Sequence, residues 1–199
     1  DLRAARAALG FLPLAITPPP AGVADAPVVI DSPHSGATYP ATMGSVLPLT
    51  QLRDGEDAFV DQLWDKAPGQ GATLLAARFP RVWLDPNRGL ADIDEALLDA
   101  PWPGPVSPSR KTELGIGLVW RLMDGAPMYD RRLSVAEVQS RIEHGWRPYH
   151  RALATLQAAA LKRHGRLWHL NVHSMPDDSY RQLGLPEKPL ADFVLGTLD

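Results

Sequence analysis

Residues 28–36 read Val-Val-Ile-Asp-Ser-Pro-His-Ser-Gly, and this stretch decides the fold class. Three consecutive aliphatic residues that end in a proline-containing polar loop are typical of a buried strand. A matching strand is predicted at 167–172, where Trp168, Leu170 and Val172 alternate with polar residues that point to the opposite face. Each of the two strands leads into a histidine, which places polar chemistry at the strand ends.

The segments between these strands alternate between strand and helix patterns. Further strands are predicted at 72–77 and 82–84. A helix is predicted over 50–66, because apolar residues recur there at helical spacing. A second helical region is predicted at 134–165, from a capping-box sequence to a glycine stop, with a kink or split at Pro148. Strands that alternate with helices predict an α/β fold, whose ligand sites lie beyond the carboxyl ends of its strands.

The chain divides into a short leading segment and one main domain. Residues 1–25 are an Ala/Arg-rich segment followed by prolines, and we expect them to form an arm on the surface. Residues 26–199 form the main domain. The four prolines within 100–110 exclude regular structure there.

The composition is that of an ordinary globular protein. The 199 residues are 45% hydrophobic and 22% charged, with a formal net charge of −3. Such a chain lacks the basic footprint of a nucleic-acid-binding protein, and without cysteine it has neither disulfides nor thiolate metal sites. No stretch reaches the roughly 20 apolar residues that cross a bilayer. We therefore expect a cytoplasmic protein with a small-molecule partner; no pattern indicates an oligomeric state.

Two histidines stand directly after predicted strands. His34 follows the strand at 28–30, and His173 follows the strand at 167–172. Together with a carboxylate they predict a zinc site with three protein ligands and an open position for water, although each alone is more typical of a hydrogen-bonded loop residue. His169 points to the same side as His173, but four strand residues separate them by roughly 13 Å. This is too far for both to bind one ion through zinc–nitrogen bonds of about 2.1 Å.

The carboxylate ligand is expected from the predicted helix at 50–66. Four aspartates form an acidic stripe along it: Asp54, Asp57, Asp61 and Asp65. Like charges at this spacing are mildly destabilising, and a nearby cation relieves them. A solvated helix face is the alternative interpretation. Glu56 and Asp57, near the start of the helix, are the better ligand candidates.

Candidate substrate contacts lie in the turn that follows the predicted strand at 82–84. Asn87 and Arg88 stand in this turn, where an arginine can bind a substrate carboxylate through two parallel hydrogen bonds. An exposed structural arginine is the alternative. Arg81 is placed either to polarise a carbonyl or to balance the acidic stripe. His150, near the expected kink, is a catalytic candidate if it faces a cleft.

Other chemistries lack their signatures. The chain has no Gly-rich phosphate loop of the Walker or Rossmann type and no Gly-x-Ser-x-Gly nucleophile elbow. The residues alone therefore favour a metal-dependent hydrolase.

Six motifs in register resemble the N-formylglutamate amidohydrolase family. They occur in the family's order from about residue 26 to the end of the chain, so the combination is specific although each motif is short. The motifs are Ser32-Pro-His34-Ser-Gly36, Glu56-Asp57-Ala-Phe-Val-Asp61, Asp85-Pro-Asn87-Arg88, Pro148-Tyr149-His150, His173-Ser174-Met175 and Ala191-Asp192-Phe-Val-Leu-Gly196.

The resemblance implies a fold, a cofactor and a reaction. The family is similar to the zinc carboxypeptidases and aspartoacylases, which implies an α/β fold with a central mixed sheet flanked by helices, of the phosphorylase/hydrolase-like type. The implied reaction is the zinc-dependent release of formate, or of another small acyl group, from an N-acyl acidic amino acid such as N-formylglutamate, in histidine degradation.

The resemblance also assigns roles to residues. It implies that the metal ligands are His34, Asp57 and His173. It further implies that Asn87 and Arg88 bind the substrate's carboxylate, and that Arg81 stabilises the developing oxyanion.

Two departures from the family pattern stand out. Asn171 replaces an aspartate that often stands two residues before the second zinc histidine, so a supporting carboxylate is lost there. The family's water-activating glutamate, in a late Gln-x-Glu strand, has no counterpart, and we expect the domain at 26–199 to lack its C-terminal part.

Two alternative functions stay open. One is a related zinc deacylase or carboxypeptidase acting on another N-acyl amino acid or a small peptide; the other is a non-catalytic, metal-stabilised binding protein.

Overall fold

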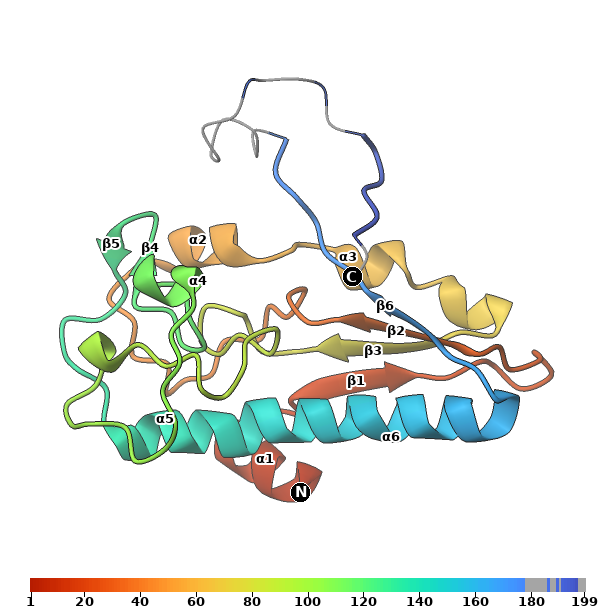
Figure 1. Ribbon diagram of the computed structural model, residues 1–199, viewed down its shortest axis with the longest axis horizontal. Coiled ribbons are helices and arrows are strands. Elements are labelled where there is room, and N and C mark those ends of the chain that lie inside the picture. The colour runs from red at the N-terminus through yellow and green to blue at the C-terminus, as the bar shows by residue number, and fades with distance from the viewer. Residues whose placement is uncertain (178–185, 187–188, 190, 197–199) are drawn as a thin grey trace.

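A four-stranded mixed sheet forms the centre of the protein, in the order β1-β3-β2-β6 (Figure 1). The computed structural model describes residues 1–177, 186, 189 and 191–196. Strands β2, β3 and β6 are parallel, and β1 lies antiparallel to β3 at one edge. The strand bounds are Leu14–Thr17 for β1, Val28–Ser32 for β2, Thr73–Ala77 for β3 and Trp168–Asn171 for β6. The expected α/β fold with a central mixed sheet is confirmed.

Helices flank this sheet on both sides. Helix α6 packs across β2 and β3 on one side, while α2 and α3 lie on the other (Figure 1). The helix bounds are Leu2–Leu9 for α1, Leu49–Leu52 for α2, Val60–Leu63 for α3, Arg110–Glu113 for α4, Val135–Arg141 for α5 and Arg147–His164 for α6, with a π-helical stretch at Ile142–Trp146. A small hairpin, β4 (Leu122–Met123) and β5 (Ala126–Pro127), and 3-10 turns at Arg53–Gly55, Ala67–Gln70 and Glu95–Leu97 complete the elements.

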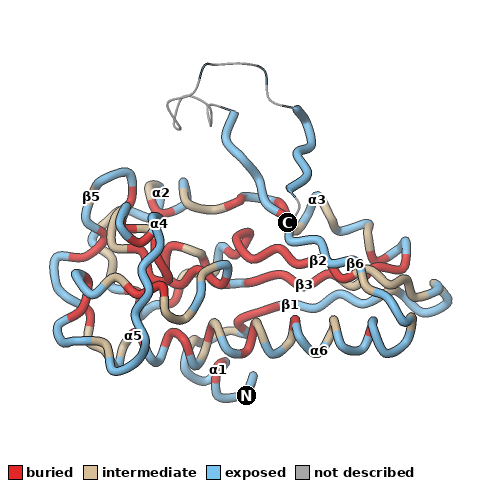
Figure 2. The backbone as a smooth tube through the Cα atoms, viewed as in Figure 1, coloured by how far each residue is buried: buried red, intermediate tan, exposed pale blue. Residues whose placement is uncertain are grey.

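Alternate residues of β2 enter the two cores that cover the sheet. Val29 belongs to the large core beneath α6, and its neighbour Ile30 belongs to a smaller core with Val60 of α3. Both side chains are buried because helices cover both faces of the sheet at this central strand. Figure 2 shows β2 as a mostly buried segment. A central strand that is buried on both faces explains why the sequence there reads as a continuous apolar run.

The predicted helix over 50–66 is wrong as a continuous element. The chain makes α2, a 3-10 turn and then α3, with a non-helical segment at 56–59 between them. The backbone N–H of Asp57 donates to the carbonyl of His34 at 3.0 Å, and not to a helix carbonyl. Phe59 adopts a left-handed conformation with φ 65°. The apolar spacing is present, but the segment breaks where it meets the loop after β2.

The predicted strand at 82–84 is also wrong. The N–H groups of Trp83 and Leu84 both donate to the carbonyl of Pro80, at 3.1 and 3.4 Å, which makes this segment a turn. Its side chains are nonetheless buried in the large core. A short apolar run marks burial without distinguishing a strand from a buried turn.

The second helical region is confirmed, including its signals. The Ser134 hydroxyl accepts the N–H of Glu137 at 3.1 Å, and Gly165 ends α6 in a left-handed conformation. The regular α-helix is interrupted by the π-helical stretch just before Pro148. Residues 1–25, expected to form an arm on the surface, contain α1 and the edge strand β1.

No helix in the described part of the chain is long and apolar enough to cross a membrane.

A glycine at the end of the loop after β2 is required by close backbone contact. A Cβ atom at Gly36 collides with the backbone carbonyl of Phe79, just beyond β3. We expect Gly36→Ala to lower the free energy of unfolding by about 1–3 kcal/mol, because backbone has to move. The control is Gly69→Ala, where an added Cβ meets nothing within 4 Å. Urea denaturation of both variants tests this, and equal stability of the two contradicts the contact.

Candidate metal centre

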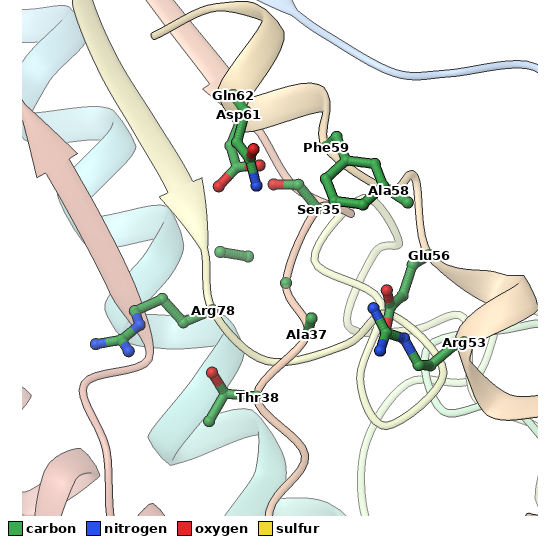
Figure 3. A pocket seen from close by; sticks show the side chains of 12 residues that line it. Ser35, Ala37, Thr38, Arg53, Glu56, Ala58, Phe59, Asp61, Gln62 and Arg78 are labelled. Carbon is green, nitrogen blue, oxygen red and sulfur yellow. The ribbon is translucent and has the colours of Figure 1, made fainter. Parts of the chain in front are cut away.

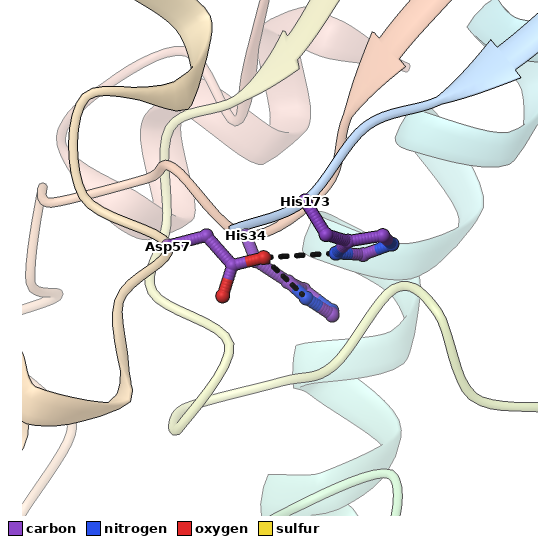
Figure 4. A group of neighbouring side chains, drawn as sticks. All are labelled: His34, Asp57 and His173. Carbon is purple, nitrogen blue, oxygen red and sulfur yellow. Dashed lines mark hydrogen bonds and ion pairs between the residues drawn. The ribbon is translucent and has the colours of Figure 1, made fainter. Parts of the chain in front are cut away.

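Three side chains from distant parts of the sequence converge beyond the carboxyl ends of β2 and β6 (Figure 4). His34 follows β2 and His173 follows β6, and because these strands are parallel neighbours their imidazole rings lie 4.6 Å apart. Asp57 joins them from the 56–59 segment, which its backbone bond to His34 holds in place. One donor atom from each of the three residues lies within 4.8 Å of the others. The site ligands expected from the sequence are therefore brought together.

Asp57 supplies the carboxylate oxygen on which the two imidazoles converge. Its Oδ2 lies 2.8 Å from Nδ1 of His173 and 3.5 Å from Nδ1 of His34. Burial alone raises the pKa of the Asp57 carboxyl. The hydrogen bond from His173, together with the neighbouring His34 imidazole and the charge of Arg81, nevertheless holds that pKa well below its usual range. Asp57 is therefore a carboxylate despite its burial.

His34 is oriented by a buried aspartate that the sequence did not single out. Nε2 of His34 lies 2.7 Å from Oδ1 of Asp85, which is fully buried. Burial raises the pKa of Asp85, but the hydrogen bond from His34 and the charges of Arg81 and Arg88 bring it to about 2. An ionised carboxylate only accepts hydrogen bonds, so His34 carries its proton on Nε2. Its Nδ1 is buried and has no hydrogen-bond partner among the described residues.

The geometry of His173 leads to the same conclusion. Its Nε2 lies 2.6 Å from Oδ1 of Asn171, an oxygen that only accepts, so this ring also carries its proton on Nε2. Nδ1 of each ring then faces the same carboxylate oxygen, and it is the nitrogen of each ring that is placed to bind a metal ion. Two imidazoles and one carboxylate are the donor set of a catalytic zinc site with an open fourth position.

The open side of this group is the side of His173. His34 and Asp57 are buried, whereas about a third of the His173 side chain is exposed. An exchangeable ligand or a substrate therefore has access from there.

Arg81 bridges two buried carboxylates beneath the group. Its Nη1 lies 3.3 Å from Oδ1 of Asp57, and its Nη2 lies 3.2 Å from Oδ2 of Asp85. Its guanidinium also lies over the ring of Trp120, at 5.2 Å from the centroid. Of the two roles expected from the sequence, the contacts are those of a residue that balances acidic charge.

The turn at 85–88 places Asn87 at the group and Arg88 beside it. The Asn87 N–H donates to Asp85 at 2.8 Å, and its side-chain amide lies 3.3 Å from Nε2 of His173. The guanidinium of Arg88 lies 3.9 Å from the carboxylates of both Asp85 and Asp92, with only long contacts to each.

His150 supports this turn from behind. Its Nε2 lies 2.8 Å from the carbonyl of Pro86, and its ring stacks on Trp146 with centroids 3.8 Å apart. Trp146 donates from Nε1 to the carbonyl of Arg88 at 2.9 Å. Burial lowers the pKa of His150. The catalytic role expected for His150 stays a prediction; the contacts are those of a residue that holds the turn.

Glu56 and the stripe residue Asp61, both from the predicted helix at 50–66, do not join the group of His34, Asp57 and His173. Glu56 accepts the Tyr39 hydroxyl at 2.9 Å, so of the two ligand candidates only Asp57 reaches the histidines. Asp61 and Glu56 instead line a neighbouring cavity of about 200 Å³, shown in Figure 3. The stripe required one continuous helix, and the break at 56–59 separates its members.

Comparison with known proteins points to one family. The model of the N-formylglutamate amidohydrolase family matches residues 26–199. An N-formylglutamate deformylase of Pseudomonas aeruginosa is 29% identical over 177 residues, which cover 86% of this chain and 59% of that protein. The crystal structure of an N-formylglutamate amidohydrolase from Ralstonia eutropha JMP134 superposes with a TM-score of 0.87 at 52% identity, over 92% of this chain and 65% of that one. This chain thus spans less than two thirds of either relative.

The assignment of His173 as a metal ligand predicts that replacing this one residue disrupts metal binding. We expect His173→Ala to remove most of the zinc that the protein binds, because two donors hold the ion far less tightly than three. The matched control is His144→Ala, whose imidazole lies within hydrogen-bond distance of Ser140 on an exposed helix face. Elemental analysis after dialysis against zinc measures both variants. Full zinc occupancy in His173→Ala contradicts the ligand assignment.

Proposed function

This chain belongs to the N-formylglutamate amidohydrolase family, and we propose that it hydrolyses N-formylglutamate to formate and glutamate at a zinc ion. The observation that carries the proposal is the convergence of the Nδ1 atoms of His34 and His173 on the carboxylate of Asp57. In such a site, bound zinc lowers the pKa of a coordinated water towards about 7 and polarises the amide carbonyl. We assign this reaction to histidine degradation, as the family resemblance implies.

The residues of the chain fix the charge and orientation of the ligands. Asp85 holds His34 with its proton on Nε2, and Arg81 offsets the charges of Asp57 and Asp85. Removing either partner from such a buried pair leaves an uncompensated charge, which is strongly destabilising. These contacts keep the ligand set in one arrangement before a substrate arrives. The oxyanion-stabilising role of Arg81 stays a prediction.

The turn at 85–88 supplies the proposed substrate contacts. Asn87 touches His173 on the exposed side of the group, so its amide is within reach of a molecule that lies at the open position. Arg88 follows it. Its Nη1 donates to the Asn87 carbonyl at 3.2 Å and its ion pairs are long, which leaves further guanidinium donors for a carboxylate of the substrate. A bidentate arginine–carboxylate contact explains selection of an acidic amino acid.

A general base for this reaction is not found next to the ligands among the described residues. Glu56 directly precedes Asp57 in sequence, but its carboxylate is occupied by the Tyr39 hydroxyl. Glu187 lies outside the described residues. The proposed function therefore rests on the metal ligands and the substrate turn.

A substrate panel tests the proposed reaction. We expect the zinc-loaded protein to release formate from N-formylglutamate faster than it releases the acyl group from N-acetylglutamate or from N-formyl derivatives of neutral amino acids. A chelator should abolish the release, and zinc should restore it. Preference for an N-acetyl or peptide substrate indicates the related deacylase or carboxypeptidase. Zinc binding without turnover on any member indicates a non-catalytic binding protein.

Arg88 provides a second, independent test of substrate recognition. We expect Arg88→Ala to weaken substrate binding by about 1.5–3 kcal/mol, the range for a hydrogen bond to a charged group, and to raise KM more than it lowers kcat. Arg88→Lys should restore only part of the affinity, because an ammonium lacks the planar two-point contact. Arg151→Ala, on the exposed surface of α6, is the control. An unchanged KM for N-formylglutamate in folded Arg88→Ala rules out this role.

A further inference from the structure

A buried aspartate on β2 lies two hydrogen bonds away from His173 and has no part in the contacts described above. Asp31 is 1% exposed, and its strand register places it opposite Asn171 of β6. Its carboxylate receives hydrogen bonds from three side chains: the Tyr149 hydroxyl at 2.7 Å, Nε2 of His169 at 2.7 Å and Nδ2 of Asn171 at 3.1 Å to each oxygen. Hydrogen bonds from His169, Tyr149 and Asn171 overcome the effect of burial, and the pKa of Asp31 is lowered.

The charge on Asp31 determines which way the Asn171 amide faces. A carboxylate can only accept hydrogen bonds, so Asn171 has to present its NH₂ group to Asp31. The amide oxygen of Asn171 then points the other way, to 2.6 Å from Nε2 of His173. Because that oxygen also only accepts, the imidazole has to carry its proton on Nε2. Nδ1 of His173 is then the ring nitrogen that faces Asp57 and the position of the metal.

One contact competes with this assignment. The side-chain amide of Asn87 also approaches Nε2 of His173, at 3.3 Å with its nitrogen. The contact of Nε2 with Asn171, at 2.6 Å, is shorter than its contact with Asn87, at 3.3 Å. Asn171 is also fixed by two hydrogen bonds to the charged carboxylate of Asp31. The amide of Asn87 has no such anchor, and exchanging its nitrogen and oxygen turns this contact into a second acceptor for the same proton.

We propose that Asp31 is a positioning residue for the metal centre, acting through Asn171 to hold His173 with Nδ1 presented to the metal. The inference rests on the proposed zinc site. Its direct counterpart is Asp85, which holds His34 through one hydrogen bond instead of two. The carboxylate that a metal-binding histidine usually has as its partner is thus supplied from the neighbouring strand. The two ligand histidines are oriented by two separate buried acids.

The hydrogen-bonded pair of Asp31 and Asn171 leads to a specific prediction for variants in which the two residues are exchanged. In Asp31→Asn the charge is lost, so Asn171 is free to turn its NH₂ group towards His173, which favours the other tautomer. The double variant Asp31→Asn/Asn171→Asp restores an acceptor next to His173, with the new amide at position 31 donating to the new carboxylate. We expect the single variant to bind zinc about 10- to 100-fold more weakly and the double variant to recover most of that loss.

Tyr149→Phe is the matched control. It removes one hydrogen bond from Asp31 and leaves the bonds to Asn171 in place. It lowers stability by the loss of a buried hydrogen bond but should leave the His173 tautomer and zinc affinity unchanged. A purely structural role for Asp31 makes Tyr149→Phe and Asp31→Asn behave alike.

The experiment reads the tautomer separately from metal binding and activity. Long-range ¹H–¹⁵N spectra of histidine-labelled protein at pH 8, with and without zinc, report which ring nitrogen of His173 is protonated, and zinc titration gives the affinity. We expect the Nε2 proton in the native protein, in Tyr149→Phe and in the double variant, and its loss from Nε2 in metal-free Asp31→Asn. An unchanged tautomer in Asp31→Asn, or the same change in Tyr149→Phe, overturns the proposal. Failure of the native protein to bind zinc contradicts the proposed function instead, and the metal-free spectra still decide the role of Asp31.

Discussion

The parallel pairing of β6 with β2 is the constraint on which the rest of the site depends. The register that pairs Asp31 with Asn171 carries both strands to the same edge of the sheet, and the loop after each strand then delivers one imidazole. A one-residue shift in this register turns each side chain of β6 to the opposite face of the sheet. It would withdraw the Asn171 contact from Asp31. The strand register and the ligand geometry are therefore one property of the fold.

Three buried carboxylates at this edge explain why so many neighbours are donors. Asp31, Asp57 and Asp85 are each less than 9% exposed, and a buried charge without partners is very costly. Each is met by at least two donating groups from histidine, arginine, tyrosine or asparagine. Full satisfaction rigidifies such a network, and partial loss is destabilising. The hydrogen bonds that hold these charges in place are the same ones that orient the metal ligands.

The sequence was sufficient to predict features that depend on local pattern. The predicted strand ends located His34 and His173, and the motif comparison selected Asp57. Prediction from the sequence failed where long-range contacts override the local pattern. The helix at 50–66 breaks because Asp57 bonds to His34, and the mostly exposed edge strand β1 has too little apolar alternation to be recognised. Asp85 and Asp31 were overlooked as site residues because their roles depend on cross-strand and loop contacts. The sequence did contain a signal for both residues, because Asp31 directly follows the apolar run at 28–30 and Asp85 directly follows the one at 82–84.

The start of α6 connects the two halves of the site. Trp146, Tyr149 and His150 stand at i, i+3 and i+4, so they share one helix face. Trp146 and His150 hold the backbone of the turn at 85–88, which carries Asp85 towards His34, while Tyr149 donates to Asp31 without touching Asn171. The π-helical stretch ends at Trp146, and a π-bulge rotates the residues that follow it relative to a regular α-helix. The interruption before Pro148 thus sets which face α6 presents, and that face contacts both the turn at 85–88 and β2.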